Sequence, residues 1–271
     1  MSTATLTPET RARTSAEAGV TIGRVIRSEW IKLRSLRSTA ITLGAALVVV
    51  IGFGLLAASV VSGDGGGPGG GPIDPTDLSL SGVTLGQLIL GVLGVLVIAG
   101  EYSTGMIRAT LAAVPTRLPV LWAKVVVFGG VTLVVSLVAT VAAFLAGQAA
   151  LGADGVALGD DGTLRAVFGA AIYLTGIGLL GLALGAILRH TAGAIGALVG
   201  LILILPTMVG LLPDSWSEPL TKILPSNAGS AFMSADPAST LLSSGAGLAV
   251  FIAWIVGALA VAAVLMRRRD A

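Results

Sequence analysis

Residues 39–61 read TAITLGAALVVVIGFGLLAASVV, a stretch of 23 residues without a charged side chain. As a helix at 1.5 Å per residue it measures about 34 Å, enough to cross a hydrocarbon core of about 30 Å. A signal peptide has a short basic leader and an apolar core of about 7–15 residues, whereas here 38 residues precede the apolar stretch. We therefore expect a retained membrane span.

The composition of the whole chain agrees with this expectation. Of 271 residues, 55% are hydrophobic and 11% charged, and mean hydropathy is +0.97. A typical soluble domain carries about 25% charged residues. The sequence pI is about 9.4, but the basic residues flank apolar stretches and do not cover a soluble face, which argues against nucleic-acid binding. The composition predicts an all-α integral membrane protein.

Two residue types are too scarce for several kinds of chemistry. The chain has no cysteine, which excludes disulfides, thiolate metal sites and cysteine nucleophiles. It has a single histidine, His190, which is too few for a histidine-built metal site. His190 follows Arg189 at the end of an apolar stretch, where such a pair is typical of a polar helix end. We expect no metal site.

Apolar stretches separated by polar or glycine-rich segments divide the rest of the chain. The turn between the fourth and fifth stretches is so short that these two should form an antiparallel hairpin. Pro206 should kink the fifth. The glycine pairs Gly181/Gly185 and Gly196/Gly200 have the spacing of close helix contacts, within the chain or in a dimer. We expect six spans, at about 39–61, 80–100, 119–147, 164–188, 192–212 and 246–266.

The segments outside the spans differ in character. Residues 1–20 are polar without periodicity, which predicts a disordered tail. The Gly/Pro-rich residues 62–77 lack the Lys-Ser/Thr of a phosphate-binding loop, so we interpret them as a flexible connector. The domain organisation that we expect is a tail at 1–20, an amphipathic interfacial helix at 21–38, a transmembrane domain at 39–266 and a basic end at 267–271.

The expected interfacial helix has an apolar face and a basic face, as helices lying on a membrane do. One interpretation is an elbow helix that sets the angle of the first span and contacts a partner. The other is a basic cluster that only retains the N-terminus inside. The candidate residues of this helix are Arg24, Arg27, Glu29, Trp30, Lys32 and Arg34.

Basic residues also predict the orientation. Of the 16 Lys and Arg residues, all but Arg165 and Lys222 lie in segments that an even number of spans places on one side. Because positive residues favour the cytoplasm, we expect both termini to be inside. The segment from Glu101 to Arg117 is then cytoplasmic.

The sequence lacks the motifs for binding ATP and for intramembrane proteolysis. There is no Gly-x-x-x-x-Gly-Lys-Ser/Thr for ATP, and no His-Glu-x-x-His or second histidine for proteolysis. No charged residue lies deep in an expected span, where ion and proton paths usually carry one. The chain either depends on an energising partner or does not transport.

The segment after the second span is the remaining candidate for a functional site. Between Gly105 and Val114 the pattern predicts a short amphipathic helix that Pro115 ends. Its apolar stripe should hold Met106, Ile107, Thr110, Leu111 and Val114, with Arg108, Ala109 and Ala112 facing away. From the residues alone, the segment is either a docking helix or a loop lying on lipid headgroups.

Two charged residues beside this segment also invite predictions. Glu101 ends the second span, where the helix C-terminus is already partly negative. We therefore expect a basic partner for it, with Arg24, Arg27 and Arg108 as candidates. Lys124, early in the third span, should snorkel back to the same interface.

The sequence resembles ABC transporter permeases of the ABC-2 type. The resemblance rests on Ser28-Glu29-Trp30-Ile31-Lys32-Leu33-Arg34-Ser35 before the first span and on Glu101-Tyr-Ser-Thr-Gly-Met-Ile-Arg-Ala-Thr-Leu111 after the second. The long segment before the last span is similar to the external re-entrant hairpin of that family. The Gly/Pro-rich first external loop departs from the pattern and looks like an insertion.

The resemblance implies a permease subunit, without catalytic residues of its own, in a homodimer or heterodimer in the cell membrane, here a bacterial inner membrane. ATP and magnesium would bind to separate cytoplasmic ATPase subunits, and the cargo would be exported. The alternative is a non-transporting membrane protein, such as an assembly factor or sensor. The residues implied to couple to the ATPase are Glu101, Gly105, Met106, Ile107, Arg108, Leu111 and Val114.

Overall fold

The computed structural model describes residues 21–64, 74–114, 117–236 and 242–268, and these ranges contain helices and no strand. The expected tail at 1–20, the glycine-rich centre of the 62–77 loop, Pro115 and residues 269–271 lie outside the described residues. The all-helical fold class is confirmed for the part of the chain that is described.

Six helices in the described ranges are long and apolar enough to cross a membrane, as the sequence predicts. The fifth span is a rod of three consecutive pieces. The spans are α3 (Arg37–Asp64), α5 (Val83–Ser103), α7 (Leu118–Leu151), α8 (Thr163–Leu188), the rod α9 (Thr191–Val199), η2 (Gly200–Ile204) and α10 (Leu205–Val209), and α13 (Ser244–Arg268).

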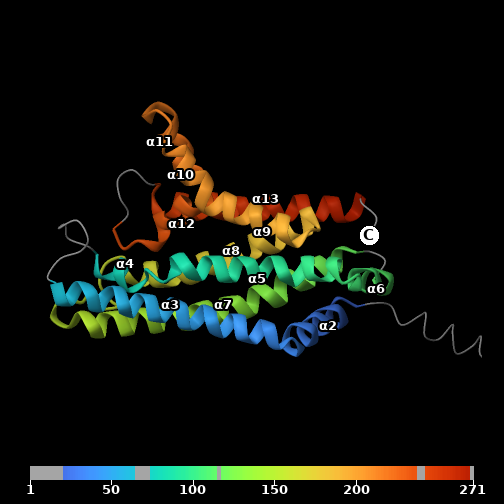
Figure 1. Ribbon diagram of the computed structural model, residues 1–271, viewed down its shortest axis with the longest axis horizontal. Helices are drawn as coiled ribbons and strands as arrows, with labels where there is room; N and C mark the ends of the chain where they lie inside the picture. Colours follow the sequence, from blue (N-terminus) through green and yellow to red (C-terminus); the bar gives the residue numbers. More distant parts are fainter. Residues whose placement is uncertain (1–20, 65–73, 115–116, 237–241, 269–271) are drawn as a thin grey trace, which may run out of the picture.

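The shorter helices gather at the two ends of the bundle (Figure 1). One end, called the α6 end below, carries α2 (Ile22–Ser35), α6 (Met106–Ala113) and the last turn of α13. The opposite end, called the α4 end, carries α4 (Pro75–Ser79), η1 (Gly152–Asp154) and α12 (Pro225–Met233). The described chain therefore enters and leaves the bundle at the same end.

Helix α8 is the most buried span, and it packs most extensively against α5. Glycines bring the two backbones together: a Cβ on Gly94 would collide with the carbonyl oxygen of Gly178, and one on Gly181 with that of Gly91. A Cβ on Gly185 would contact Val95 and Ile98 of α5. The Gly181/Gly185 pair thus serves packing within the chain.

The second glycine pair behaves differently, since nothing lies within 4 Å of a Cβ placed on Gly196 or Gly200. The rod that carries them changes character at Gly200–Ile204, which form a π-helical turn directly before Pro206. Proline has no backbone N–H to donate, and its ring crowds the turn that precedes it. A π-helical turn is a local interruption of the α-helical pattern of the kind found at such positions. The kink predicted at Pro206 stays a prediction, and the irregularity beside it is this π-helical turn.

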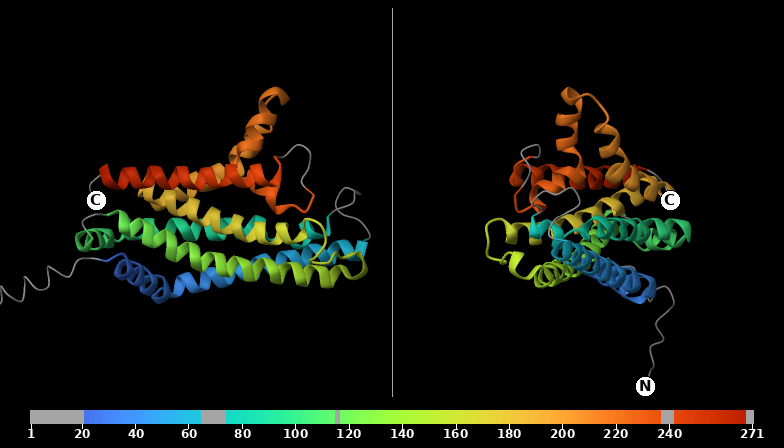
Figure 2. Two further views of the ribbon diagram at one scale, coloured as in Figure 1. Left: turned by 180° about the vertical axis from the view of Figure 1, so that it is seen from behind. Right: turned by 60° about the vertical axis from the view of Figure 1, so that its left-hand side comes forward.

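The segment before the last span forms two short helices. Helix α11 (Asp214–Ile223) has no buried residue and stands away from the bundle in every view (Figures 1 and 2). Helix α12 packs against α8 and α13. The Trp254 indole N–H of α13 donates to the carbonyl of Ile223 at 2.8 Å, which ties the end of α11 to the bundle.

Candidate functional site

Gly105 is the N-cap of α6, and its φ of +73° is a left-handed conformation that glycine adopts without strain. The side chains of Ile107, Leu111 and Val114 are buried in a small core that is separate from the main one. Val25 of α2 and Val120 and Ala123 of α7 complete that core. The helix is therefore seated on two neighbouring elements and is not a loop lying free at the end of the bundle.

The outward face of α6 carries Arg108, Ala109, Ala112 and Ala113, all exposed. Met106, which the sequence pattern places on the buried stripe, is 45% exposed. Met106 is the first residue of α6 and does not take part in the small core that Ile107 and Leu111 enter. The exposed face thus consists of small side chains with one arginine and one methionine.

Behind α6 lies a cluster of four charged side chains, Glu29, Lys32, Glu101 and Lys124, which we call the ion cluster. Lys124 Nζ lies 2.6 Å from Glu29 Oε2 and 2.6 Å from Glu101 Oε1. Lys32 Nζ lies 2.7 Å from Glu29 Oε1 and 3.1 Å from Glu101 Oε1. Two acids and two bases from α2, α5 and α7 are joined in one network.

The ion cluster also reaches α6, because Lys32 Nζ donates to Thr110 Oγ1 at 3.2 Å. The Lys124 side chain is only 2% exposed, and those of Glu29 and Glu101 are 5% exposed. Removing one charged partner from such a buried group leaves an uncompensated charge, which is strongly unfavourable. The cluster therefore holds four helices in one arrangement.

Lys32 is the most accessible member of the ion cluster. Burial by itself lowers the pKa of Lys32, but the hydrogen bond and charge of Glu29, together with those of Glu101, raise it above its usual value. Lys32 is therefore charged at every physiological pH, and its contribution to stability is lost only as pH rises through that raised pKa.

The predicted partners of Glu101 are wrong. Arg24, Arg27 and Arg108 are exposed, and Glu101 pairs with Lys32 and Lys124 instead. The face of α2 that packs inward carries Val25, Glu29 and Lys32, spaced by four and three residues, so Arg24 and Arg27 turn outward.

Lys124 does reach back to the boundary where Glu101 lies, as predicted, but its ammonium group is enclosed by the two carboxylates and is not exposed. A signal in the sequence for this arrangement is the presence of two acids and two lysines at the same expected boundary. Their equal number allows a neutral buried group. The other residues proposed for α2, Trp30 and Arg34, lie on its exposed face.

A groove of about 360 Å³ separates α2 from α6 at the surface. Glu29 and Lys32 of the ion cluster line it, together with buried residues of the small core and exposed side chains of both helices. The lining residues are Arg24, Val25, Ser28, Glu29, Lys32, Ala109, Thr110, Ala113 and Val114. The groove adjoins the exposed face of α6, because Ala109 and Ala113 belong to both.

Residues 25–199 match the model of the ABC-2 family transporter protein, which covers well over half of the chain. The chain belongs to the ABC-2 transporter family. This membership makes it a permease component of an ABC transporter and a multi-pass membrane protein that works with an ATP-binding subunit. The permease gives no match among curated proteins.

The matched range of the permease contains α2, α6 and all four residues of the ion cluster. It ends at Val199, so η2, α10, α11, α12 and α13 lie beyond it. As an ABC-2 family component the permease is a transport protein and not itself a catalyst. Among its described residues, no three His, Asp or Glu side chains are grouped to hold a metal ion.

Next to the ion cluster, the permease links the ends of α5 and α8. The guanidinium carbon of Arg189 lies 5.2 Å from the centre of the Tyr102 ring, a cation–π distance. His190 caps the following helix: its Nδ1 accepts a hydrogen bond from the Gly193 backbone N–H at 3.0 Å. The pair that the sequence marks as a polar helix end thus orders the turn between the fourth and fifth spans.

Proposed function

We propose that this chain is the transmembrane subunit of an ATP-driven exporter and that α6 is its docking helix for the cytoplasmic ATPase subunit. The observation that carries the proposal is the packing of α6 against its neighbouring helices. A small core seats it on α2 and α7, and the ion cluster connects the same place to α5. A displacement applied to α6 would reach several spans at once.

In this proposal the α6 end faces the cytoplasm, with both termini inside. The distribution of Lys and Arg supports that orientation. Glu101 acts from behind the docking surface, through its pairs with Lys32 and Lys124, and not as a contact for the partner. Arg108, Met106 and the groove between α2 and α6 meet the ATPase, which binds the ATP and magnesium.

Two permease chains, identical or different, assemble with their ATPases in a cell membrane, and cargo leaves the cell. Membership of a transporter family argues against the alternative of a non-transporting assembly factor or sensor. The basic residues on the exposed face of α2 contact lipid headgroups and retain that helix at the interface.

Co-purification tests the docking proposal. Tagged permease, extracted from its host in mild detergent, should recover an ATP-binding-cassette subunit, identified by mass spectrometry. Arg108→Glu should reduce that recovery roughly tenfold, because reversing a charge at the contact loses a charge-assisted interaction of about 1.4 kcal/mol or more.

The matched control is Arg268→Glu, which reverses an exposed charge at the same end of the bundle but on α13. It should leave recovery unchanged. Equal recovery with the wild type and Arg108→Glu would remove Arg108 from the docking surface. Purification of the wild-type permease without any such subunit would contradict the proposed function.

A further inference from the structure

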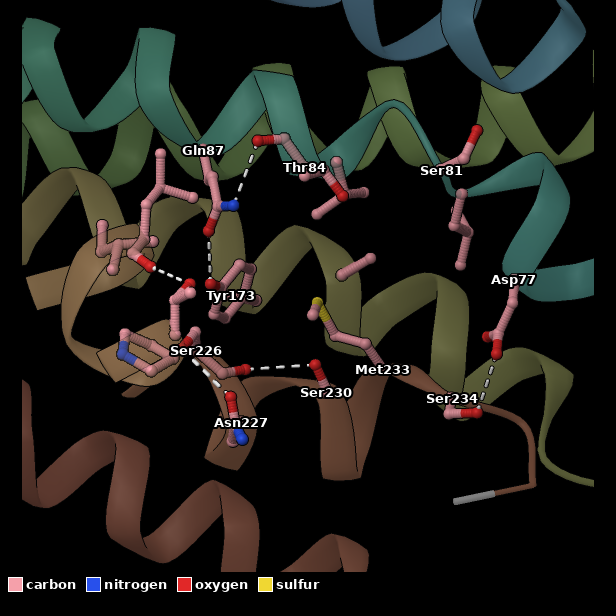
Figure 3. A pocket seen from close by; sticks show the side chains of 17 residues that line it. Asp77, Ser81, Thr84, Gln87, Tyr173, Ser226, Asn227, Ser230, Met233 and Ser234 are labelled. Atoms are coloured by element: carbon pink, nitrogen blue, oxygen red, sulfur yellow. Dashed lines mark hydrogen bonds between the residues drawn. The ribbon is translucent and has the colours of Figure 1, made fainter. Parts of the chain in front are cut away.

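A second cavity lies at the α4 end, far from α6, and has a volume of about 450 Å³ (Figure 3). Four parts of the chain enclose it: the α4–α5 corner, α8, the π-helical turn with α10, and α12. Binding sites for small molecules commonly measure about 300–1,000 Å³. The cavity has the size of such a site.

The inner end of the cavity is polar and ordered. Tyr173 Oη donates to Gln87 Oε1 at 2.5 Å, and Gln87 Nε2 donates to the carbonyl of Thr84 at 3.0 Å (Figure 3). Tyr173 and Gln87 are both buried. These hydrogen bonds hold the amide and the phenol in fixed positions.

The outer rim carries a carboxylate. Asp77 lies at the mouth, where its Oδ2 accepts a hydrogen bond from Ser234 Oγ at 3.1 Å (Figure 3). Partial burial and the charge of Asp74 raise the pKa of Asp77. A bound cation would lower it again, because a nearby opposite charge favours the ionised carboxylate. Arg165, the nearby base on α8, donates instead to the backbone carbonyls of Ser234 and Ala235.

The other lining residues are uncharged, and none of the lining residues is Lys, Arg or His. Ser81, Thr84, Ser226, Asn227 and Ser230 add hydroxyl and amide groups around the mouth and walls. One wall is apolar and is built by Ile202, Leu203 and Pro206. The cavity therefore combines one negative charge, neutral polar groups and a hydrocarbon surface.

These features favour one class of ligand over two others. An anion would meet Asp77 without any basic side chain in the lining to compensate it. A sugar usually stacks on an exposed aromatic ring, but the Tyr173 ring packs against Phe251 at 5.1 Å between ring centres. A molecule with an amine and a hydrocarbon portion satisfies both the rim and the apolar wall.

We propose that this cavity binds an amphiphilic organic cation, with its amine at Asp77 and its hydrocarbon portion against Ile202, Leu203 and Pro206. The hydroxyl and amide groups around Gln87 and Tyr173 accommodate further polar groups of the ligand. As a binding site the cavity requires no ATPase. As the substrate site of an exporter it rests on the proposed function, and it then indicates cationic amphiphiles as cargo.

Binding to the permease alone tests this proposal. The permease is reconstituted in lipid nanodiscs, and fluorescence anisotropy is measured with acridine orange, a three-ring organic cation, after subtraction of empty nanodiscs. Fluorescein, a three-ring anion, serves as the comparison dye. We expect saturable binding of acridine orange and none of fluorescein. Absence of saturable cation binding, or equal binding of the two dyes, would overturn the proposal.

Asp77→Asn keeps the shape of the side chain and an acceptor for Ser234, and it should weaken acridine orange binding roughly tenfold. Asp154→Asn, which neutralises an exposed acid at the same end, is the matched control and should bind as the wild type does. Equal weakening by the two variants would show a general effect of surface charge and would contradict the assigned site.

Ser230→Leu provides an independent check, because it places a larger side chain at a lining position that is exposed. It should abolish dye binding while the thermal unfolding temperature stays near that of the wild type. Retained binding would exclude the cavity. Because no ATPase is present in any arm, failure here would leave the docking of α6 untouched, and failure of docking would leave the cavity untouched.

Discussion

Lys124 is the residue on which the arrangement at the α6 end most depends. Its ammonium group bridges the carboxylates of Glu29 and Glu101, and its side chain is almost fully enclosed. Each ion pair in such a buried group adds little net stability. Removing one partner is strongly destabilising, because it leaves a buried charge uncompensated. This asymmetry makes the ion cluster testable by single and paired substitutions.

Lys124→Met should destabilise the permease by about 3–5 kcal/mol, because two buried carboxylates would then share only Lys32. The measurement is thermal unfolding in detergent, followed by tryptophan fluorescence. The double variant Lys124→Met/Glu101→Gln leaves one acid and one base, and it should regain most of the loss. Equal destabilisation by the single and double variants would mean that methionine simply fits poorly at this position.

At the α6 end, the face of the helix on which a residue lies determines its contacts more than the overall composition of the helix does. Helix α2 is basic overall, yet the residues that it turns inward are an acid, a lysine and a valine, Glu29, Lys32 and Val25. The arginines on its outer face are free for lipid or partner contacts. The same rule applies to α6, which buries Ile107 and Leu111 and presents Arg108 outward.

Helices α5 and α8 approach closely because glycines allow it, and this contact supports a second prediction. Gly94→Ala should destabilise the permease by about 1–3 kcal/mol, because its Cβ would overlap the backbone of α8 at Gly178 and the helices would have to separate. Thermal unfolding in detergent measures the effect.

The matched control is Gly130→Ala in α7, where nothing lies within 4 Å of the added Cβ. Alanine is the better helix former, so this variant should be as stable as the wild type or slightly more stable. If the Gly94 and Gly130 variants behaved alike, the contact between α5 and α8 would be looser than described.

At the scale of the whole molecule, much of the fold follows from apolar length alone. The stretch 39–61 and five like it predict six spans, and six apolar helices are present within the described residues. Charge-free stretches of this length have few alternatives as membrane helices. Helix α6 was likewise predictable, since Gly105, an apolar stripe and Pro115 mark its start, face and end.

The ion cluster and the second cavity were not predictable from the same signals. Glu29, Glu101 and Lys124 come from three helices, and which of their neighbours meet depends on how those helices rotate against each other. Gln87 and Tyr173 are separated by 86 residues and meet only because α5 packs on α8. Periodicity assigns residues to faces but does not say which faces meet.

The two sites lie at opposite ends of one bundle, and α5 is common to both. It carries Glu101 of the ion cluster at one end and Gln87 of the cavity at the other. Along its length it packs against α8, which supplies Tyr173. In the proposed exporter, α5 is the element that would connect a displacement of α6 to the cavity.

Site-directed cross-linking tests the docking of α6 most directly. Because the chain has no cysteine, a single one can be placed at Ala112 on the exposed face of α6, or at Ala153 on η1 at the opposite end. Membranes from the host are treated with a thiol-to-amine cross-linker, and adducts are identified by mass spectrometry. We predict an adduct with an ATP-binding-cassette subunit from Ala112→Cys and none from Ala153→Cys; the reverse pattern, or no adduct from either position, would contradict the account.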